Sequence, residues 1–187
     1  FLFDAWSQPG TKIFVMDLQK FLTENKKKLV EKWIASVIDT YPSNSVKFFK
    51  ETKDPFANPV GVSMLSSLDG LLDQLIHDMD PQRINSYLDP IIRIRAVQNF
   101  TPSQAVAFIL SLKKALRSSL TKELRDIRNV TEFSELESKI DRLSLMAFDI
   151  YMQCREKIYQ LSANEMKNRT FRAFERAGLV SEKVEGA

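Results

Sequence analysis

Apolar side chains recur at helical spacing along most of the chain, and no segment keeps a strand-like alternation for more than a few residues. Steps of three and four residues predict five amphipathic helices, over about residues 17–40, 59–79, 81–97, 102–124 and 131–177. Asn58-Pro59, Asp80-Pro81 and Thr101-Pro102 each place a capping residue directly before a proline, as at a helix start. We therefore expect an all-α five-helix bundle. Periodicity does not separate a globin-like topology from an antiparallel one.

Pro90 falls inside the third predicted helix. Because proline lacks the backbone N–H that an inner helical turn requires, we expect it to kink or divide this helix.

The last predicted helix, from Thr131 to Ala177, runs for 47 residues without proline or glycine. We expect Thr131 or a neighbour to cap its start and Gly178 to close it in the left-handed conformation. At about 1.5 Å per residue it would be roughly 70 Å long, whereas a compact chain of this size is roughly 40 Å across. We expect the first four helices to surround its N-terminal half, while the rest projects.

Along this helix, apolar residues form a seam that continues to Leu161. Its members are Phe133, Leu136, Ile140, Leu143, Ala147, Ile150, Cys154, Ile158 and Leu161. We expect Leu161, Met166, Phe171 and Phe174 to contact a second copy of the chain in a homodimer, since exposed apolar area is unfavourable in water. The alternative is a break near Ser162-Ala163-Asn164 that folds the chain back.

These patterns divide the chain into three parts. Residues 1–15 have no helical period, and we expect a loose arm or residues upstream of a true start at Met16. Residues 16–160 form the helical domain, and residues 161–187 form the extension of the long helix with a short tail.

Composition excludes several classes of protein. The 187 residues carry a net charge of only +3, with one histidine and one cysteine, which excludes a disulfide framework and any zinc site of the usual spacing. No apolar run is long enough for a transmembrane helix, so we expect a cytoplasmic protein without membrane insertion. We expect no nucleic-acid binding, because Glu165 and Glu175 dilute the arginines of the last helix.

The sequence shows no nucleophile–base pair, phosphate-binding loop or carboxylate cluster. We therefore predict no catalytic, cofactor-binding or metal-binding residues, and no enzyme. His77 is interpreted as a surface or capping residue, with a haem ligand as the alternative. Cys154, on the apolar seam, is interpreted as a small buried hydrophobe.

One polar segment is less easily placed. Ile94-Arg95-Ala96-Val97-Gln98 follows Arg93, and residues two apart do not share a helical face, so one arginine points inward or sideways. We expect Arg95 and Gln98 to be structural polar anchors, with Arg95 bound to a carboxylate or to backbone carbonyls. A contact with an anion or a partner is the alternative.

Five segments together carry a resemblance to a known family. They are Tyr41-Pro42, Phe56-Ala57-Asn58-Pro59-Val60-Gly61, Ile94 to Gln98, Phe100-Thr101-Pro102-Ser103-Gln104-Ala105 and Ala147-Phe148-Asp149-Ile150-Tyr151. In order and spacing they resemble the RsbRD N-terminal domain family, the sensor-like N-terminal domains of RsbT co-antagonist proteins of the bacterial stressosome. In multidomain members the last helix leads into a STAS domain. This sequence ends at Ala187, soon after that helix, and so resembles a stand-alone version.

The resemblance implies a helical, dimeric input module that acts by protein–protein interaction in bacterial stress signalling, with a regulatory protein of unknown identity as partner. It implies no ligand-binding residues. A sensor for a small ligand, haem included, with a cavity between helices is the alternative function, and a hydrolase or transferase is a third.

Overall fold

Helices account for nearly all of the described structure. The computed structural model describes residues 18–41, 59–77, 79–98, 100–120 and 127–179. Within these ranges the helices are α1 (Leu18–Ile38), α3 (Pro59–Ile76), α4 (Pro81–Val97), α5 (Pro102–Ser119) and α6 (Ile127–Arg176), and no described residue lies in a strand. The prediction of an all-α fold with a very long last helix is confirmed.

The signals at the helix ends act as the sequence predicts. The Asp80 carboxylate accepts a hydrogen bond from the Gln82 N–H at 2.9 Å, and Thr101 and Gln104 form the reciprocal capping box at the start of α5. Gly178 closes α6 at φ +66°, the left-handed region that glycine enters without a Cβ clash. Asn58, Leu124 and the segments 1–17 and 180–187 lie outside the described residues.

Two details differ from the prediction. We expected Pro90 to kink or divide α4, and it does not divide it, because Pro90 lies within a single helix. One missing N–H bond costs about 3 kcal/mol, and burial of Ile84, Leu88, Ile91 and Ile92 on the same helix offsets that cost. The long helix begins at Ile127, so Thr131 is an inner helical residue and does not cap it.

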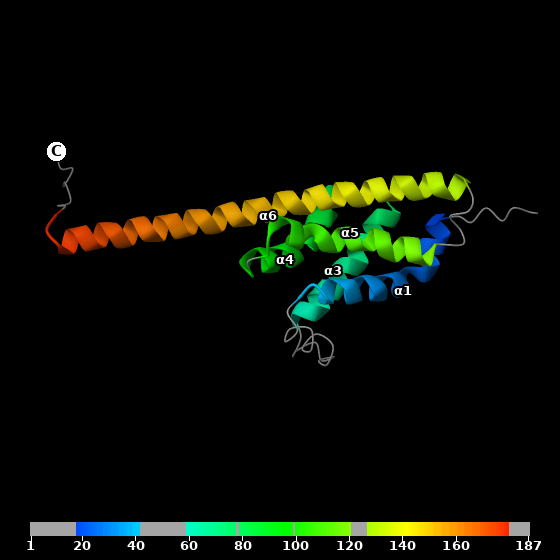
Figure 1. The fold of residues 1–187 in the computed structure, drawn as a ribbon, viewed down its shortest axis with the longest axis horizontal. Coiled ribbons are helices and arrows are strands. Elements are labelled where there is room, and N and C mark those ends of the chain that lie inside the picture. Colours follow the sequence, from blue (N-terminus) through cyan, green and yellow to red (C-terminus); the bar gives the residue numbers. More distant parts are fainter. Residues whose placement is uncertain (1–17, 42–58, 78, 99, 121–126, 180–187) are drawn as a thin grey trace, which may run out of the picture.

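Each helix packs against at least two of the others. α3 and α4 lie side by side, α1 contacts α3 and α5, and α6 lies across α4 and α5 (Figure 1). Lys26 joins α1 to α3 through Asp69 and Asp73, each 2.7 Å away. Trp33 of α1 is fully buried and donates its indole N–H to the Phe108 carbonyl of α5 at 2.7 Å. The core therefore lies between α1, α3, α4 and α5, beneath α6.

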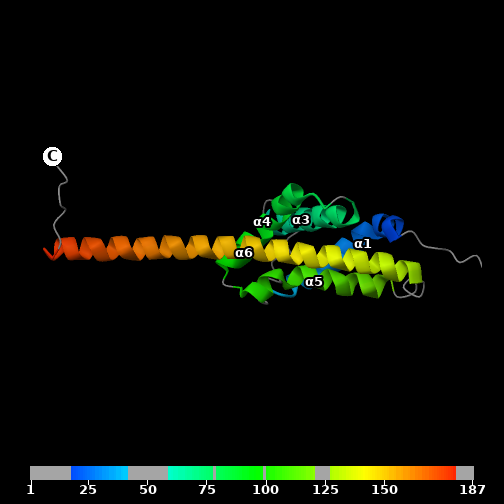
Figure 2. The ribbon, with the colours of Figure 1, turned by 90° about the horizontal axis from the view of Figure 1, so that it is seen from above.

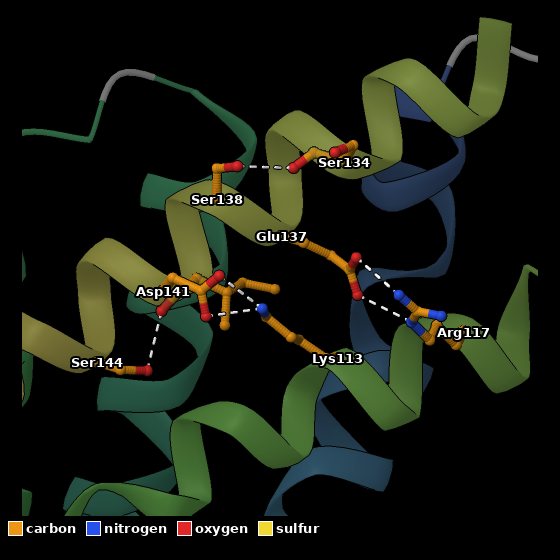
Figure 3. Close-up of polar contacts among 8 residues, drawn as sticks. Lys113, Arg117, Ser134, Glu137, Ser138, Asp141 and Ser144 are labelled. Atoms are coloured by element: carbon orange, nitrogen blue, oxygen red, sulfur yellow. Dashed lines mark hydrogen bonds and ion pairs between the residues drawn. The ribbon is translucent and has the colours of Figure 1, made fainter.

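Ion pairs set the position of α6 along α5 (Figure 3). Arg117 binds Glu137 through two hydrogen bonds of 2.9 and 2.8 Å, and Lys113 binds Asp141 at 2.7 Å. Lys113 and Arg117 are one helical turn apart, as are Glu137 and Asp141, in reversed order along the chain. The pairs therefore require α5 and α6 to run antiparallel. Since the pairs are largely exposed, they fix alignment more than they add stability.

The four other helices cover only one side of α6. Its inward seam is buried from Phe133 to Ile150, as the pattern predicts, whereas Leu145, Phe148 and Met152 are exposed. The expectation that the domain surrounds this half of α6 is wrong, because the four other helices all lie on one side of it (Figure 1). Seen from above, α6 lies in front of them (Figure 2). From Tyr159 to Leu179 every residue is exposed, and the helix runs through Ser162, Ala163 and Asn164 without a break. The chain therefore does not fold back there.

Gly70 allows α3 and α4 to approach closely. A Cβ at this position would lie 2.4–2.7 Å from ring atoms of Tyr87 on α4, which real contacts do not allow. Glycine inside a helix is unfavourable by itself. It is needed at position 70 because the Tyr87 ring leaves no room for a side chain.

We predict that Gly70→Ala lowers the free energy of unfolding by about 1–3 kcal/mol, because the methyl group overpacks against Tyr87. In a Tyr87→Ala background the same change should raise it by about 1 kcal/mol, since alanine is the better helix former. Chemical denaturation of the four proteins of this cycle measures both effects. A gain in stability from Gly70→Ala alone would show that the two helices are not in close contact.

Candidate functional site: an arginine hub where the long helix leaves the domain

Arg95, on the last turn of α4, is the largest charged side chain in the core and has no exposed surface. Its guanidinium donates to the Gln104 backbone carbonyl of α5 and to the Thr40 hydroxyl after α1, both at 3.0 Å. Within the described residues, its Nε has no hydrogen-bond partner. The cation therefore donates hydrogen bonds to one backbone carbonyl and one hydroxyl. Within the described residues, none of its hydrogen bonds is to a carboxylate.

Three aromatic rings enclose the rest of the cation. The guanidinium carbon lies 4.9 Å from the ring centre of Tyr41, 5.0 Å from that of Phe100 and 4.9 Å from that of Phe108. The negative faces of aromatic rings attract a cation within about 6 Å, and more strongly where water is excluded. Burial lowers the pKa of Arg95, and the Tyr41 hydroxyl partly opposes this shift. The guanidinium remains protonated, because an arginine in a protein does not lose its proton at neutral pH.

The same region holds α6 at the point where it leaves the domain. The Tyr151 hydroxyl donates to the Phe100 carbonyl, and Arg155 donates to the Ala96 carbonyl at 3.0 Å. Tyr151 is the last fully buried residue of α6. Figure 1 shows α4 beneath α6 where the helix begins to continue alone. We call this cluster the Arg95 hub; it consists of Thr40, Tyr41, Arg95, Ala96, Phe100, Gln104, Phe108, Tyr151 and Arg155.

The hub links the end of α1, the end of α4, the start of α5 and the middle of α6. Nothing in it resembles a nucleophile with a base, so its arrangement suits a mechanical joint better than a reaction centre. A displacement of the α4–α5 connection would move Phe100 and Ala96. Their carbonyls bind Tyr151 and Arg155 of α6, so α6 would move as well.

The predicted polar anchors do not meet in the hub. Arg95 lies at its centre, whereas Gln98 is exposed and ends α4, where its backbone N–H binds the Ile94 carbonyl at 3.0 Å. Sequence analysis missed Thr40, Phe108, Tyr151 and Arg155. One signal was available, because Tyr41, Phe100 and Tyr151 all occur in the segments that carry the family resemblance.

The four residues expected at a dimer contact all lie exposed on the projecting half of α6: Leu161, Met166, Phe171 and Phe174. They do not share one face. At about 100° per residue, Leu161 continues the inward seam while Met166 lies on roughly the opposite side.

His77 and Cys154 lie apart from the hub's cation. His77 is exposed at the end of α3 and its ring bonds the Asp73 carbonyl at 2.9 Å. Cys154 is half-buried, and burial raises the pKa of its thiol, although nearby Arg93 partly opposes the shift. A raised thiol pKa lowers the thiolate fraction on which cysteine reactivity depends. Among the described residues, no group of three or more histidine, cysteine, aspartate or glutamate side chains is placed to hold a metal ion.

A hollow of about 670 Å³ lies between α1 and α3. Val30, Val62 and Leu65 give it an apolar wall, and Lys27, Glu24 and Glu31 lie at its polar side. Neither His77 nor Cys154 lines it.

The fold and the Arg95 hub define a helical domain with a projecting helix that is bound to the domain at its base. Residues 27–166 match the family described as the RsbT co-antagonist protein rsbRD N-terminal domain, and the chain belongs to this family of sensor-like signalling domains. The match begins in α1 and ends at Met166, within the projecting half of α6.

A similar protein also covers most of the chain. An uncharacterized protein of Archaeoglobus fulgidus is 25% identical over 142 residues, which cover 75% of this chain and 84% of the relative. No solved structure was found to match the chain. In the described part of the chain, none of the helices combines the length and apolar character needed to span a bilayer.

We predict that Arg95→Met lowers the free energy of unfolding by about 2 kcal/mol or more. The substitution removes two hydrogen bonds of a charged donor and the contacts with three rings. Arg93→Met is the matched control, because Arg93 is exposed and binds Asp89 on the surface of the same helix. This variant should cost less than about 1 kcal/mol. Thermal and urea unfolding measure both variants, and equal effects would argue against the hub as a structural joint.

Proposed function

We propose that this chain is a non-enzymatic regulatory input domain that acts by protein–protein contact in the cytoplasm, and that it works as a homodimer joined through α6. The chief support is the projecting half of α6. A helix of 50 residues is about 75 Å long, and every residue of its last third is exposed in the described structure. Most of the stability of helices in proteins comes from tertiary packing of an apolar face, so this segment fits a partner.

The exposed apolar residues suit such a partner. Met166 is 71% exposed, and Phe171 and Phe174 are 44% and 46% exposed. In a symmetric dimer a second copy buries the same residues without a second gene product. The hub gives a route for regulation, because an event in the domain that shifts the α4–α5 connection also shifts Tyr151 and Arg155, and thereby α6.

A regulatory protein is the further partner that we propose, since a domain of this kind has to pass its state to another molecule. No catalysis, cofactor or nucleic acid is part of this function.

The hollow between α1 and α3 favours a second candidate function, the sensing of a small ligand. Its volume falls within the range of about 300–1,000 Å³ that ligand sites occupy, and its wall is apolar. Haem is the less suitable occupant, because His77 is not among the residues around the hollow.

Sedimentation equilibrium tests the homodimer. We predict about twice the chain mass of 21.6 kDa for the wild type at micromolar concentration. Phe171→Glu combined with Phe174→Glu should give a monomer, because four carboxylates would be buried in each dimer. Leu110→Glu, at an exposed position on α5, is the control and should remain dimeric. A wild type that is monomeric at high micromolar concentration would contradict the dimer.

Mass spectrometry of protein purified from its native host tests the ligand sensor. We predict that any small molecule released on denaturation of the wild type is lost in Val62→Trp, because Val62 lines the hollow and is partly exposed, and is kept in the Leu110→Glu control. Release from both variants would show that the molecule binds elsewhere. If the wild type releases no small molecule, the ligand-sensing function is contradicted.

A further inference from the structure

The hollow between α1 and α3 has an apolar end and a polar end. The two helices run in opposite directions (Figure 1), so Val30 of α1 lies at the same end of the hollow as Val62 and Leu65 of α3. Val30 is buried, whereas Val62 and Leu65 are 44% and 45% exposed. This end therefore offers an apolar surface that a ligand can cover, which is favourable because it removes the surface from water.

The polar end contains Lys26 of α1, which is bound to α3. Its Nζ atom donates hydrogen bonds to Asp69 and to Asp73, each 2.7 Å away. Burial by itself would lower the pKa of Lys26, but the two hydrogen bonds outweigh it and raise the pKa, so the amine stays charged. Because two carboxylates already neutralise this cation, it offers little attraction to an anionic ligand.

Acidic groups outnumber basic ones around the hollow. Three of the residues that line it are acidic and two are basic: Glu24, Glu31, Asp69, Lys26 and Lys27. Asp73 adds a further carboxylate through its bond to Lys26, and Lys20, which lies 3.9 Å from Glu24, adds a further amine. The whole group has a net charge of −1. It therefore attracts a cation and repels an anion.

Asp69 is the carboxylate best placed to receive a cation. It lines the hollow, and its side chain is 49% exposed although its Oδ2 atom accepts a hydrogen bond from Lys26. A carboxylate has two oxygens with about four acceptor sites, so Asp69 can accept from a second donor at the same time. Thr23 and Ser66 are exposed and add two hydroxyl groups to the lining.

The dimensions of the hollow restrict the size of a ligand. Along α1 its lining extends from Thr23 to Glu31, which corresponds to about 12 Å at about 1.5 Å per residue. The occupant is therefore a small molecule with an apolar part at one end and a charged group at the other.

We propose that this hollow binds a small organic amine, which has one ammonium group and an apolar body no longer than about 12 Å. The ammonium group lies beside Asp69, and the body packs against Val30, Val62 and Leu65. This inference rests on the ligand-sensing function proposed above and adds the chemical class of the ligand.

Calorimetric titration of the whole chain with three matched probes tests this class. Hexylammonium, hexanol and hexanoate each have a chain of six carbons and differ in charge. We expect hexylammonium to bind at least about tenfold more tightly than hexanoate, which corresponds to about 1.4 kcal/mol, with hexanol between them. At about 1 M salt, where the Debye length is about 3 Å, this preference should become smaller.

Asp69→Asn and Asp73→Asn form a matched pair that tests where the ammonium group lies. Each variant removes one of the two carboxylates that bind Lys26 and keeps the other, but of these two residues it is Asp69 that lines the hollow. We expect the affinity for hexylammonium to fall about tenfold in Asp69→Asn and less than about threefold in Asp73→Asn. Val62→Trp should lose binding and Leu110→Glu should keep it. Thermal unfolding checks that all four variants are folded.

The outcomes separate the amine class from ligand sensing in general. Binding of hexanoate as tight as that of hexylammonium would overturn the amine class and keep the ligand-sensing function. Equal losses in Asp69→Asn and Asp73→Asn, or full binding by Val62→Trp, would overturn the location. Binding of none of the three probes would also overturn the inference, while ligand sensing itself is decided by whether the wild type releases a molecule on denaturation.

Discussion

The enclosure of one arginine connects most of the molecule. Arg95 is buried without a hydrogen bond to any carboxylate of the described residues, and a buried cation is unfavourable unless other groups replace its water shell. Here that replacement needs Thr40 and Tyr41 from the end of α1, Phe100 and Phe108 from around α5, and the Gln104 carbonyl. No single element can supply such a set. The end of α1, the end of α4 and the start of α5 must therefore meet, and the planar guanidinium restricts the geometry of this meeting.

The residues around Arg95 also fix the position of α6, because backbone carbonyls in the same region bind side chains of α6. Phe100 covers the guanidinium with its ring and accepts a hydrogen bond from Tyr151 with its carbonyl. Ala96, directly after Arg95, accepts one from Arg155. The rigid core is thus joined to the projecting helix by a few directional contacts at one place. Packing along the inward seam holds α6 on the domain, and the hub determines where that packing ends.

The two faces of α6 give the helix two roles. Its inward seam is covered by α4 and α5, while Leu145, Phe148 and Met152 on its other side are exposed in the described structure. One helix therefore both closes the core and presents an exposed apolar face, because its two apolar rows lie on opposite sides and its length exceeds that of the core.

The sequence alone determined the elements and the class of fold. Helical period, three capping signals and Gly178 are local features, and each depends on interactions within a few residues, so they predicted the five helices and the length of α6. Local reasoning also identified Arg95 as an unusual residue between large aliphatic neighbours. It was wrong about Thr131, because α6 begins earlier, at Ile127. Of the two effects expected at Pro90, the division of α4 does not occur, because tertiary packing holds the helix together.

Only the tertiary structure decided what encloses Arg95 and which side of α6 is covered. Thr40 and Phe108 lie 55 and 13 positions from Arg95 in sequence, and no local spacing relates them. The sequence likewise contains both apolar rows of α6, and spacing alone does not tell which one faces the core. That choice is made by α4 and α5, because Glu137 and Asp141 can reach Arg117 and Lys113 only when the inward seam lies against the domain.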